Sequence, residues 1–307
     1  MPGPPPPACY PGSDPGYTPP RPYRPSPPHS PGPWNAANWL EKKYNSSDSD
    51  SGKLAGLICW AILVLTAAGA VFALLSILPA IAVFFVNCLV VYFVIGLNSL
   101  AEHGRNVATP LKAGDLPAAR QQIAMMVSRD TDKLSEQQVA AATCESVLEN
   151  GSDAVFAALF WFLLLGAPGA ILYRFANTLD AMWGYKTDRY RQFGWAAARI
   201  DDILNWLPAR LTALSYALMG SFSTAIKCSR EQGGETDSPN AGYVMAAGAG
   251  ALKVSMGGSA NYQGEAHQRP VFGIGPAVAS DDIERAISLV ERSAILWLAA
   301  VLLLEFL

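Results

Sequence analysis

The sequence predicts an all-α, polytopic integral membrane protein with about four to five membrane-embedded helices and polar helical loops. About half of the 307 residues are hydrophobic. Only 15% are charged, against roughly 25% in a typical soluble domain. Four long stretches contain no charged residue, namely 54–101, 154–173, 211–226 and 293–304. We find no internal repeat and no convincing β-strand, so helices that lie in lipid are the expected architecture.

The longest uncharged run lies between Lys53 and Glu102. A membrane-spanning helix needs about 20 apolar residues, so this run is long enough for two. Pro79 stands near its middle, where it would remove a helical hydrogen bond. We therefore expect a helical hairpin made of residues 54–78 and 80–97. Each helix would be apolar on all sides, which is typical of membrane spans.

The remaining uncharged stretches are shorter and less regular. Residues 154–173 contain the helix-breaking run Gly-Ala-Pro-Gly at 166–169. This run predicts either one kinked span or a re-entrant pair of half-helices, and its exposed backbone must face protein or water rather than lipid. Residues 211–226 are short for a span. Residues 293–304 fit either a marginal span or a helix that lies in the membrane interface.

The composition divides the chain into two parts. Residues 1–33 are so rich in proline that neither helix nor sheet is expected there, and we predict a disordered segment. Residues 34–307 form the expected membrane domain. The Lys and Arg counts of successive loops do not differ enough to orient this domain in the membrane.

Several function classes are unsupported. The net charge of -3 leaves no basic footprint for nucleic acid. The five cysteines form no CxxC pair, and no Cys/His spacing typical of zinc occurs. The chain also lacks the GxxxxGK[ST], GxSxG and HExxH motifs, which argues against P-loop, serine-hydrolase and zinc-protease mechanisms.

An acidic stripe is the first candidate site. Glu145, Glu149 and Asp153 are spaced i, i+4, i+8 and would share one helix face. Ser135 with Gln138 three residues on predicts a capping box at the start of this helix. The stripe fits either a solvated face or a Mg²⁺ site, whose ligands are carboxylate oxygens. It runs directly into an apolar segment, where acids are costly and usually functional, and this favours the site.

Residues 177–210 are the second candidate, because acids, bases and aromatic residues are densest there. An ion-paired turn at the membrane interface is the simpler interpretation. The functional one is an anion site with an adjacent metal site. Its basic candidates for phosphate are Lys186, Arg189, Arg199 and Arg210, and its acidic candidates for metal are Asp180, Asp201 or Asp202.

This block also carries a family resemblance. The run GAPGAILYRFANTLDAMWGYKTDRYRQFGWAAARIDDILNWLPARLTAL resembles the CobD/CbiB signature without a gap. SLAEH, GDLPAAR, SRDT, ESVLEN and SPNAG match it as well. The resemblance extends from about residue 39 to the C-terminus. It implies a multi-pass protein of the cell (inner) membrane with a cytoplasmic active site.

The resemblance further implies an adenosylcobinamide or adenosylcobinamide-phosphate synthase. Such an enzyme joins adenosylcobyric acid to aminopropanol or aminopropanol phosphate, with ATP and Mg²⁺ as cofactors, late in adenosylcobalamin assembly. Other cobalamin-pathway enzymes are possible partners. A carboxylate is a poor acyl donor, so ATP must first convert one of its oxygens into a leaving group, through an acyl phosphate or an acyl adenylate. Phosphate-binding and metal-binding groups are needed for either route.

These considerations give a set of candidate residues with three roles. The catalytic candidates are Glu145, Glu149, Asp180, Lys186, Arg199 and Asp202. The metal candidates among them are Glu149, Asp180 and Asp202. The substrate-binding candidates are Arg129, Asn177, Tyr185, Asn205, Arg210 and Asn240.

Two other functions remain as alternatives. A non-catalytic, AmpE-like membrane sensor or regulatory protein is a distant relative of this family, but it would not need the NTLD, GYK and RIDD blocks that this chain retains. A transporter is disfavoured because the polar motifs lie mostly outside the expected spans.

Overall fold

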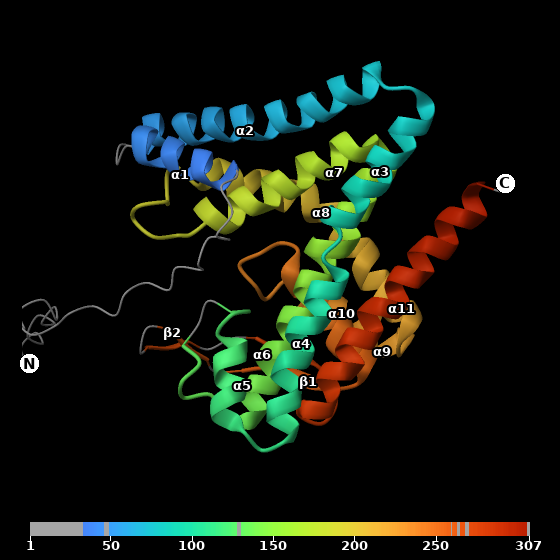
Figure 1. Ribbon diagram of the computed structural model, residues 1–307. Coiled ribbons are helices and arrows are strands. Elements are labelled where there is room, and N and C mark those ends of the chain that lie inside the picture. The colour runs from blue at the N-terminus through green and yellow to red at the C-terminus, as the bar shows by residue number, and fades with distance from the viewer. Residues whose placement is uncertain are drawn as a thin grey trace, which may run out of the picture.

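The computed structural model describes residues 33–45, 49–127, 130–258, 260–262, 265–267 and 270–305, and the Pro-rich segment predicted to be disordered lies almost wholly outside them. The described part of the chain is mostly helical (Figure 1). Its helices are α1 Pro33–Tyr44, α2 Ser49–Ile77, α3 Ala80–Val94, α4 Leu97–Lys112, α5 Leu116–Ile123, α6 Glu136–Gly151, the π-helix η1 Ser152–Phe156, α7 Ala157–Trp183, α8 Trp195–Met219, α9 Phe222–Gln232, α10 Ala241–Leu252 and α11 Ser280–Glu305.

Four short strands follow α10, contrary to the expectation of no strand. They are β1 Ser255–Gly257, β2 Ala260–Tyr262, β3 Glu265–His267 and β4 Val271–Gly273. β1 pairs antiparallel with β4, and β2 with β3. Each strand has three residues, so none is long enough to show the alternation that identifies a strand in a sequence.

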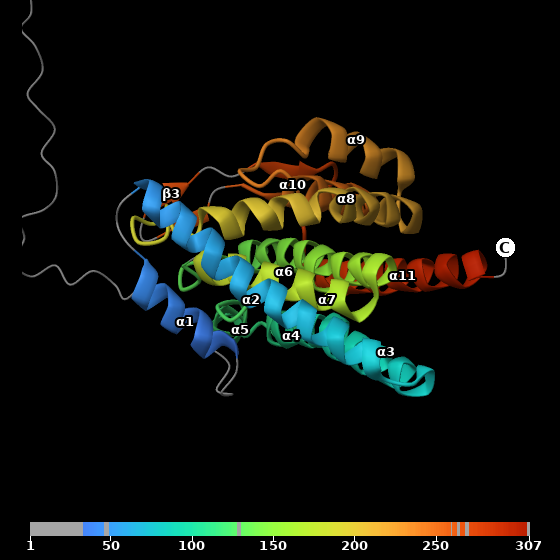
Figure 2. The same cartoon turned by 90° about the horizontal axis from the view of Figure 1, so that it is seen from above.

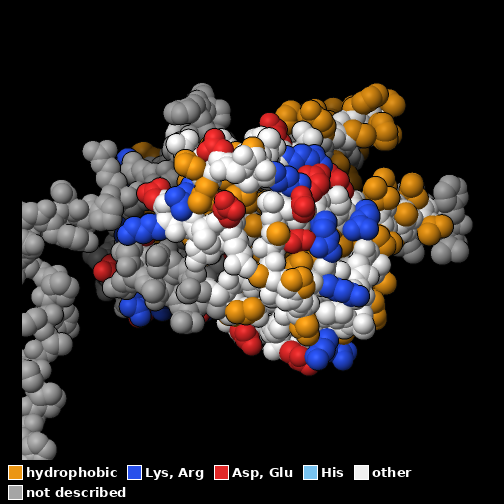
Figure 3. Space-filling model, turned by 90° about the horizontal axis from the view of Figure 1, so that it is seen from below, with side chains coloured by type: hydrophobic (Ala, Val, Ile, Leu, Met, Phe, Trp, Pro, Cys, Tyr) orange, Lys and Arg blue, Asp and Glu red, His pale blue; other side chains and the backbone are white. Residues whose placement is uncertain are grey.

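The prediction of a multi-pass membrane protein is confirmed. Within the described residues, four helical segments are long and apolar enough to cross a membrane, namely Asp50–Ile77, Ala80–Lys112, Glu136–Trp183 and Ser280–Leu303. The junction of α2 with α3 and the C-terminal end of α11 lie at the same end of the molecule (Figure 2). Hydrophobic side chains gather on two projections at this end, whereas charged side chains are spread over the rest of the face (Figure 3). The exposed hydrophobic side chains at this end are suited to contact with lipid.

The predicted break at Pro79 is present, but the predicted hairpin is wrong. α2 ends at Ile77, and α3 starts at Ala80 with Pro79 as its N-cap residue. From this junction the two helices diverge (Figure 1), and both pack against α7 instead. Both helices are apolar on all sides, so no single face directs them to each other, and α7 provides the common contact.

The Gly-Ala-Pro-Gly run turns the chain back on itself inside α7. Gly166 has φ 65° and ψ -157°, a conformation that only glycine adopts readily. A Cβ atom on Gly169 would lie 2.4 Å from the carbonyl oxygen of Trp161, eight residues earlier. A straight helix separates such residues by about 12 Å. Of the two structures that the sequence allows, the pair of half-helices is therefore the one present.

α6 lies at the centre of the main core. Residues 139–148 are all buried, and α4, α8, α10 and α11 contribute to the same core cluster. The predicted capping box at its start is confirmed, because Ser135 Oγ accepts from the Gln138 backbone N–H and the Gln138 side chain accepts from the Ser135 N–H. Residues 211–226 form no span of their own, since Gly220 and Ser221 separate α8 from α9. Residues 293–304 continue α11 without a break.

Candidate functional site

An acid-lined cavity of about 190 Å³ lies between the end of α6, the end of α7, the first half of α8 and the start of α10. We call it the acid cavity. Five carboxylates line it, namely Glu149, Asp153, Asp180, Asp201 and Asp202. Its other lining residues are Ser152, Ala198, Asn205, Ala209, Ser238, Asn240, Ala241 and Val244. No Lys or Arg among the described residues lines this cavity, so its electrostatic character favours cations.

A change of helix type brings the first two acids into the cavity. The α-helix α6 passes directly into the π-helix η1 at Ser152, and such π-turns occur often at functional sites. Glu149 and Asp153 lie on either side of this transition and both line the cavity. The Tyr216 hydroxyl donates to the Leu148 carbonyl at 2.9 Å, which ties the transition to α8.

A buried hydrogen-bond network fixes Asp201. Asn177 and Asn205 donate to its two carboxylate oxygens at 3.3 and 2.9 Å. The Tyr173 hydroxyl in turn donates to Asn205 Oδ1 at 2.8 Å. Burial raises the pKa of Asp201 to about 6, although the two amide hydrogen bonds act in the opposite direction. Asp201 is thus a rigidly held carboxylate that exchanges its proton near neutral pH.

Asp202 and Asp180 complete the acidic lining from neighbouring helices. Arg199, one turn earlier on α8, makes an ion pair with Asp202 at 3.2 Å. Burial raises the pKa of Asp202, and Arg199 partly offsets this shift. Asp180 comes from the last turn of α7 and faces the same cavity. The predicted clamp Arg199 therefore stands beside the cavity and is bound to one of its acids.

Arg210 holds the segment before α10 against α8. Its guanidinium donates to Asn240 Oδ1 at 2.6 Å and to the Pro239 carbonyl at 3.0 Å. Asn240 donates to the Asp202 backbone carbonyl at 2.7 Å. The same guanidinium stacks 4.8 Å from the centre of the Trp206 ring and 4.5 Å from that of Tyr243. Arg210 thus holds the lining residue Asn240 in position, and it acts on the cavity through Asn240.

The other basic candidates lie in the connection between α7 and α8. Lys186 makes a highly exposed ion pair with Asp237 at 2.7 Å. Arg189 makes an ion pair with the buried Glu41 of α1, also at 2.7 Å. Neither lines the acid cavity. Lys186 nevertheless joins the α7–α8 connection to the segment that carries Asn240.

Comparison with known proteins identifies the family to which this chain belongs. The family model described as CobD/Cbib protein matches residues 27–290. The chain belongs to the CobD/CbiB family. Its role therefore lies in cobalamin biosynthesis.

Three relatives illustrate how closely the chain follows the CobD/CbiB family, and each is described as a cobalamin biosynthesis protein CobD. The protein of Stutzerimonas stutzeri is 51% identical over 87% of this chain and 87% of its own. That of Chromobacterium violaceum is 61% identical over 68% of this chain and 67% of its own. That of Halalkalibacterium halodurans is 36% identical over 88% of this chain and 84% of its own. No solved structure matches.

The fold brings together a large part of the predicted set. The predicted residues that line the acid cavity are Glu149, Asp180, Asp202, Asn205 and Asn240. Those that bond to a lining residue are Asn177, Arg199 and Arg210. Their chemical roles stay predictions.

Three other predicted residues within the described structure do not line the cavity. Glu145 is buried in α6, one turn before Glu149, and lines no part of it. Tyr185 and Lys186 lie in the α7–α8 connection, where the Tyr185 ring centre is 6.4 Å from that of Tyr190. Arg129 lies outside the described residues.

Sequence reasoning also left some lining residues without a role. Asp153 belonged to the predicted acidic stripe but received no assignment, and Asp201 was one of three interchangeable acids. Ser152 and Ser238 carried no signal beyond their position next to ESVLEN and SPNAG. The strongest available signal was the position of Asp153 inside an apolar segment, where an acid is costly.

The acids do not form a complete metal site by themselves. Among the described residues, no group of three or more His, Cys, Asp and Glu side chains is arranged to hold a metal ion. Mg²⁺, however, usually takes only one or two carboxylates and completes its coordination with water and substrate phosphates. The donor set fits this smaller contribution, because Asp180 and Asp202 are hard oxygen donors that face one cavity.

Proposed function

We propose that this protein is an adenosylcobinamide or adenosylcobinamide-phosphate synthase. The reaction joins the free carboxylate of adenosylcobyric acid to the amine of aminopropanol or aminopropanol phosphate, with ATP consumed. The observation that carries the proposal is the convergence of five carboxylates from α6, η1, α7 and α8 on one small cavity. Membership in the CobD/CbiB family supplies the corrinoid pathway in which such a cavity would act.

The acid cavity suits the amine partner. An amino alcohol is an ammonium ion at neutral pH, and a cavity lined by acids without bases attracts a cation. The nitrogen must lose a proton before it attacks the acyl carbon, because an ammonium has no lone pair. Asp201 is the acceptor that we assign, since it lines the cavity and its pKa of about 6 lies near neutral pH. Asn177 and Asn205 hold its carboxylate in position.

The phosphate chemistry would take place at the edge of the same cavity. Asp180 and Asp202 would hold Mg²⁺, which neutralises phosphate charge when bound. Arg199 lies beside Asp202, with which it makes an ion pair, and supplies a positive charge at the lining. Lys186 stands at the exposed end of the site and carries the second positive charge. Arg210 keeps Asn240 and the backbone around it in place.

Most of the residues that line the acid cavity are polar. ATP is a cytoplasmic substrate, so we infer that the acid cavity faces the cytoplasm and that the protein lies in the cell (inner) membrane. Its corrinoid substrate would reach the site from the aqueous side.

A ligation assay on the purified full-length protein tests the proposal. The mixture would contain adenosylcobyric acid, Mg-ATP and either aminopropanol or its phosphate, and mass spectrometry would follow the corrinoid product. We expect an amide whose formation depends on ATP, and the preferred amine would define the substrate. A folded sample that forms no amide with either amine would refute the proposal and favour a sensor role.

A further inference from the structure

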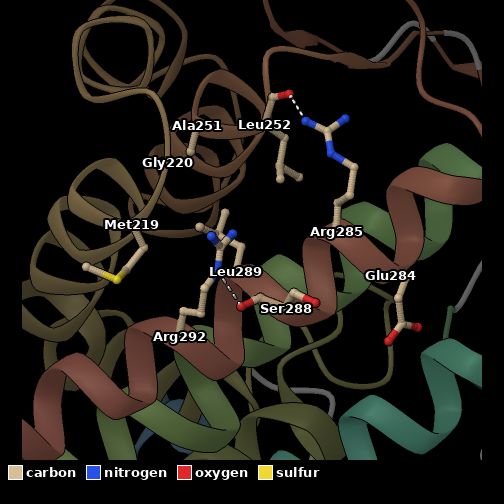
Figure 4. A pocket seen from close by; sticks show the side chains of 9 residues that line it. All are labelled: Met219, Gly220, Ala251, Leu252, Glu284, Arg285, Ser288, Leu289 and Arg292. Carbon is tan, nitrogen blue, oxygen red and sulfur yellow. Dashed lines mark hydrogen bonds between the residues drawn. The ribbon is translucent and has the colours of Figure 1, made fainter.

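A second, larger cavity of about 550 Å³ lies between α11, the turn from α8 to α9 and the end of α10. We call it the arginine cavity. Figure 4 shows its lining side chains. They are Met219, Gly220, Ala251, Leu252, Glu284, Arg285, Ser288, Leu289 and Arg292. It shares no lining residue with the acid cavity.

Two guanidinium groups, those of Arg285 and Arg292, line this cavity. Within the described residues, Arg292 donates one hydrogen bond, to the Ser288 carbonyl of its own helix, and no acid makes an ion pair with it. Arg285 donates to Asp282 and to the Leu252 carbonyl, and about half of its side chain stays exposed. The one acid in the lining, Glu284, makes an ion pair with Arg105 of α4 at 2.9 Å, and Arg105 also pairs with Glu291 at 3.2 Å. The guanidinium of Arg292 is thus available to an anion.

Part of the cavity wall is apolar, and so is the surface beside it. Leu252 and Leu289 form part of the lining. Next to it, Leu218 and Phe222 are about half exposed, and the side chain of Ile295 is 65% exposed. The cavity therefore stands where α11 changes from its charged first half to its apolar second half. In a membrane protein this boundary lies at the level of the lipid headgroups.

Helix geometry adds a further attraction for anions. α9 begins immediately after Gly220 and Ser221, and no side chain caps its N-terminus. The free N–H groups of a first helical turn carry partial positive charge, and they lie beside the cavity lining at Gly220. Arg292, Arg285 and this helix end together surround a space large enough for a phosphate group with its glycerol.

We propose that the arginine cavity binds the headgroup of an anionic phospholipid, with the acyl chains lying along the exposed apolar side chains of α8, α9 and α11. Basic pockets between membrane helices are known to bind such headgroups. A free phosphate ion would use the same guanidinium groups, but it would gain nothing from the apolar surface beside them. The lipid is therefore the ligand that accounts for both features, and this inference does not depend on the ligation reaction.

The test measures lipid binding by the full-length protein. The protein would be reconstituted in nanodiscs of phosphatidylcholine or of phosphatidylcholine with phosphatidylglycerol. Native mass spectrometry would then count the lipids that stay bound when the protein is released from the nanodisc. We expect preferential retention of phosphatidylglycerol. Arg292→Gln should weaken this retention about fivefold, since one basic residue near anionic lipid contributes about that factor. Arg292→Lys, which keeps the charge, should retain most of it.

A matched control keeps the result specific. Arg230→Gln removes the same charge from an exposed position on α9 outside the cavity lining, and it should leave retention unchanged. Equal retention of the two lipids, or an equal loss in Arg230→Gln and Arg292→Gln, would overturn the proposal. Displacement of the lipid by millimolar inorganic phosphate would also overturn it, because a free anion would then suffice. Thermal unfolding of each variant confirms that the protein is folded.

Discussion

The two cavities differ in charge, size and surroundings. The acid cavity is small, is lined by five carboxylates and is closed by cross-linked hydrogen bonds between α7, α8 and the start of α10. The arginine cavity is larger, has guanidinium groups and lies beside exposed apolar side chains. The first has carboxylates that suit cations, and the second has guanidinium groups that suit anions. The chain thus keeps two opposite electrostatic environments apart, because their lining residues come from different helix ends.

The two cavities are also built from different parts of the chain. The acids of the first cavity come from helix segments that lie far apart along the chain, and the fold must bring them together. The second cavity takes most of its lining residues from one helix, α11, whose two basic residues, Arg285 and Arg292, lie about two turns apart. Mutations should therefore affect the two cavities independently, and the following experiments test this independence in order of expected effect.

Asp180→Asn should have the largest effect. It removes a negative charge that faces the substrate site, so ligation should fall on the order of 100-fold, the usual loss when one electrostatic group of an active site is removed. Asp188→Asn is the matched control, because Asp188 is an exposed acid of the neighbouring connection that does not line the cavity. Retention of phosphatidylglycerol should stay unchanged in both variants. Near-normal turnover in Asp180→Asn would refute the assignment of this acid.

Arg210→Gln should lower both stability and substrate affinity. The substitution removes hydrogen bonds from a charged group to Asn240 and to the Pro239 carbonyl. Such bonds contribute roughly 1.5–3 kcal/mol each, and we expect a loss of about 2 kcal/mol in the free energy of unfolding. KM should rise more than kcat falls, since the residue acts by positioning Asn240. Arg230→Gln serves again as the control, and an equal loss of stability there would contradict this role.

Asp201 should make stability depend on pH. Its folded pKa of about 6 lies above the ordinary value of 3.8, so the folded state favours the neutral acid. This contribution to stability is full below about pH 4 and is lost as the pH rises through about 6. In Asp201→Asn the melting temperature should therefore fall less between pH 5 and pH 7.5 than in the wild type. Identical slopes for the two proteins would show that Asp201 does not titrate in this range.

Lys186 and Asp237 should have the smallest effect on stability. Both side chains are highly exposed, and exposed ion pairs contribute about 0–1 kcal/mol. Lys186→Gln should nevertheless raise the KM for ATP if its charge contacts phosphate. Asp237→Asn removes the partner and leaves the lysine, so KM should stay the same or fall. A rise in KM of equal size in both variants would show that the ion pair itself is what matters.

Much of this architecture follows from local patterns. The absence of charge between Lys53 and Glu102 predicts membrane helices because a charge in lipid is costly. Pro79 and the Gly-Ala-Pro-Gly run predict breaks because proline and glycine disrupt helices wherever they stand. The capping box at Ser135 is equally local, and all of these features are present in the structure. Such predictions hold because their causes lie within a few residues of each other.

The errors concern relations between distant segments. The hairpin of α2 and α3 was wrong because helices that are apolar on all sides carry no information about their partner. The clamp role of Arg210 was predicted from its charge alone and stays a prediction, and only the fold shows that its guanidinium also bonds to Asn240. Asp201 and Asp202 are adjacent in sequence, and only the packing of α8 shows that both face the cavity.

The sequence by itself determined the helical membrane class, the CobD/CbiB motifs and most of the polar residues of the acid cavity. Only the tertiary structure decided that Glu145 stays inside the core, that Asp153 joins the cavity, and that a separate arginine-lined space exists at the end of α8. Helix periodicity and lipid solubility act over a few residues and can be read along the chain. The grouping of side chains depends on how helices pack, which is a property of the whole chain.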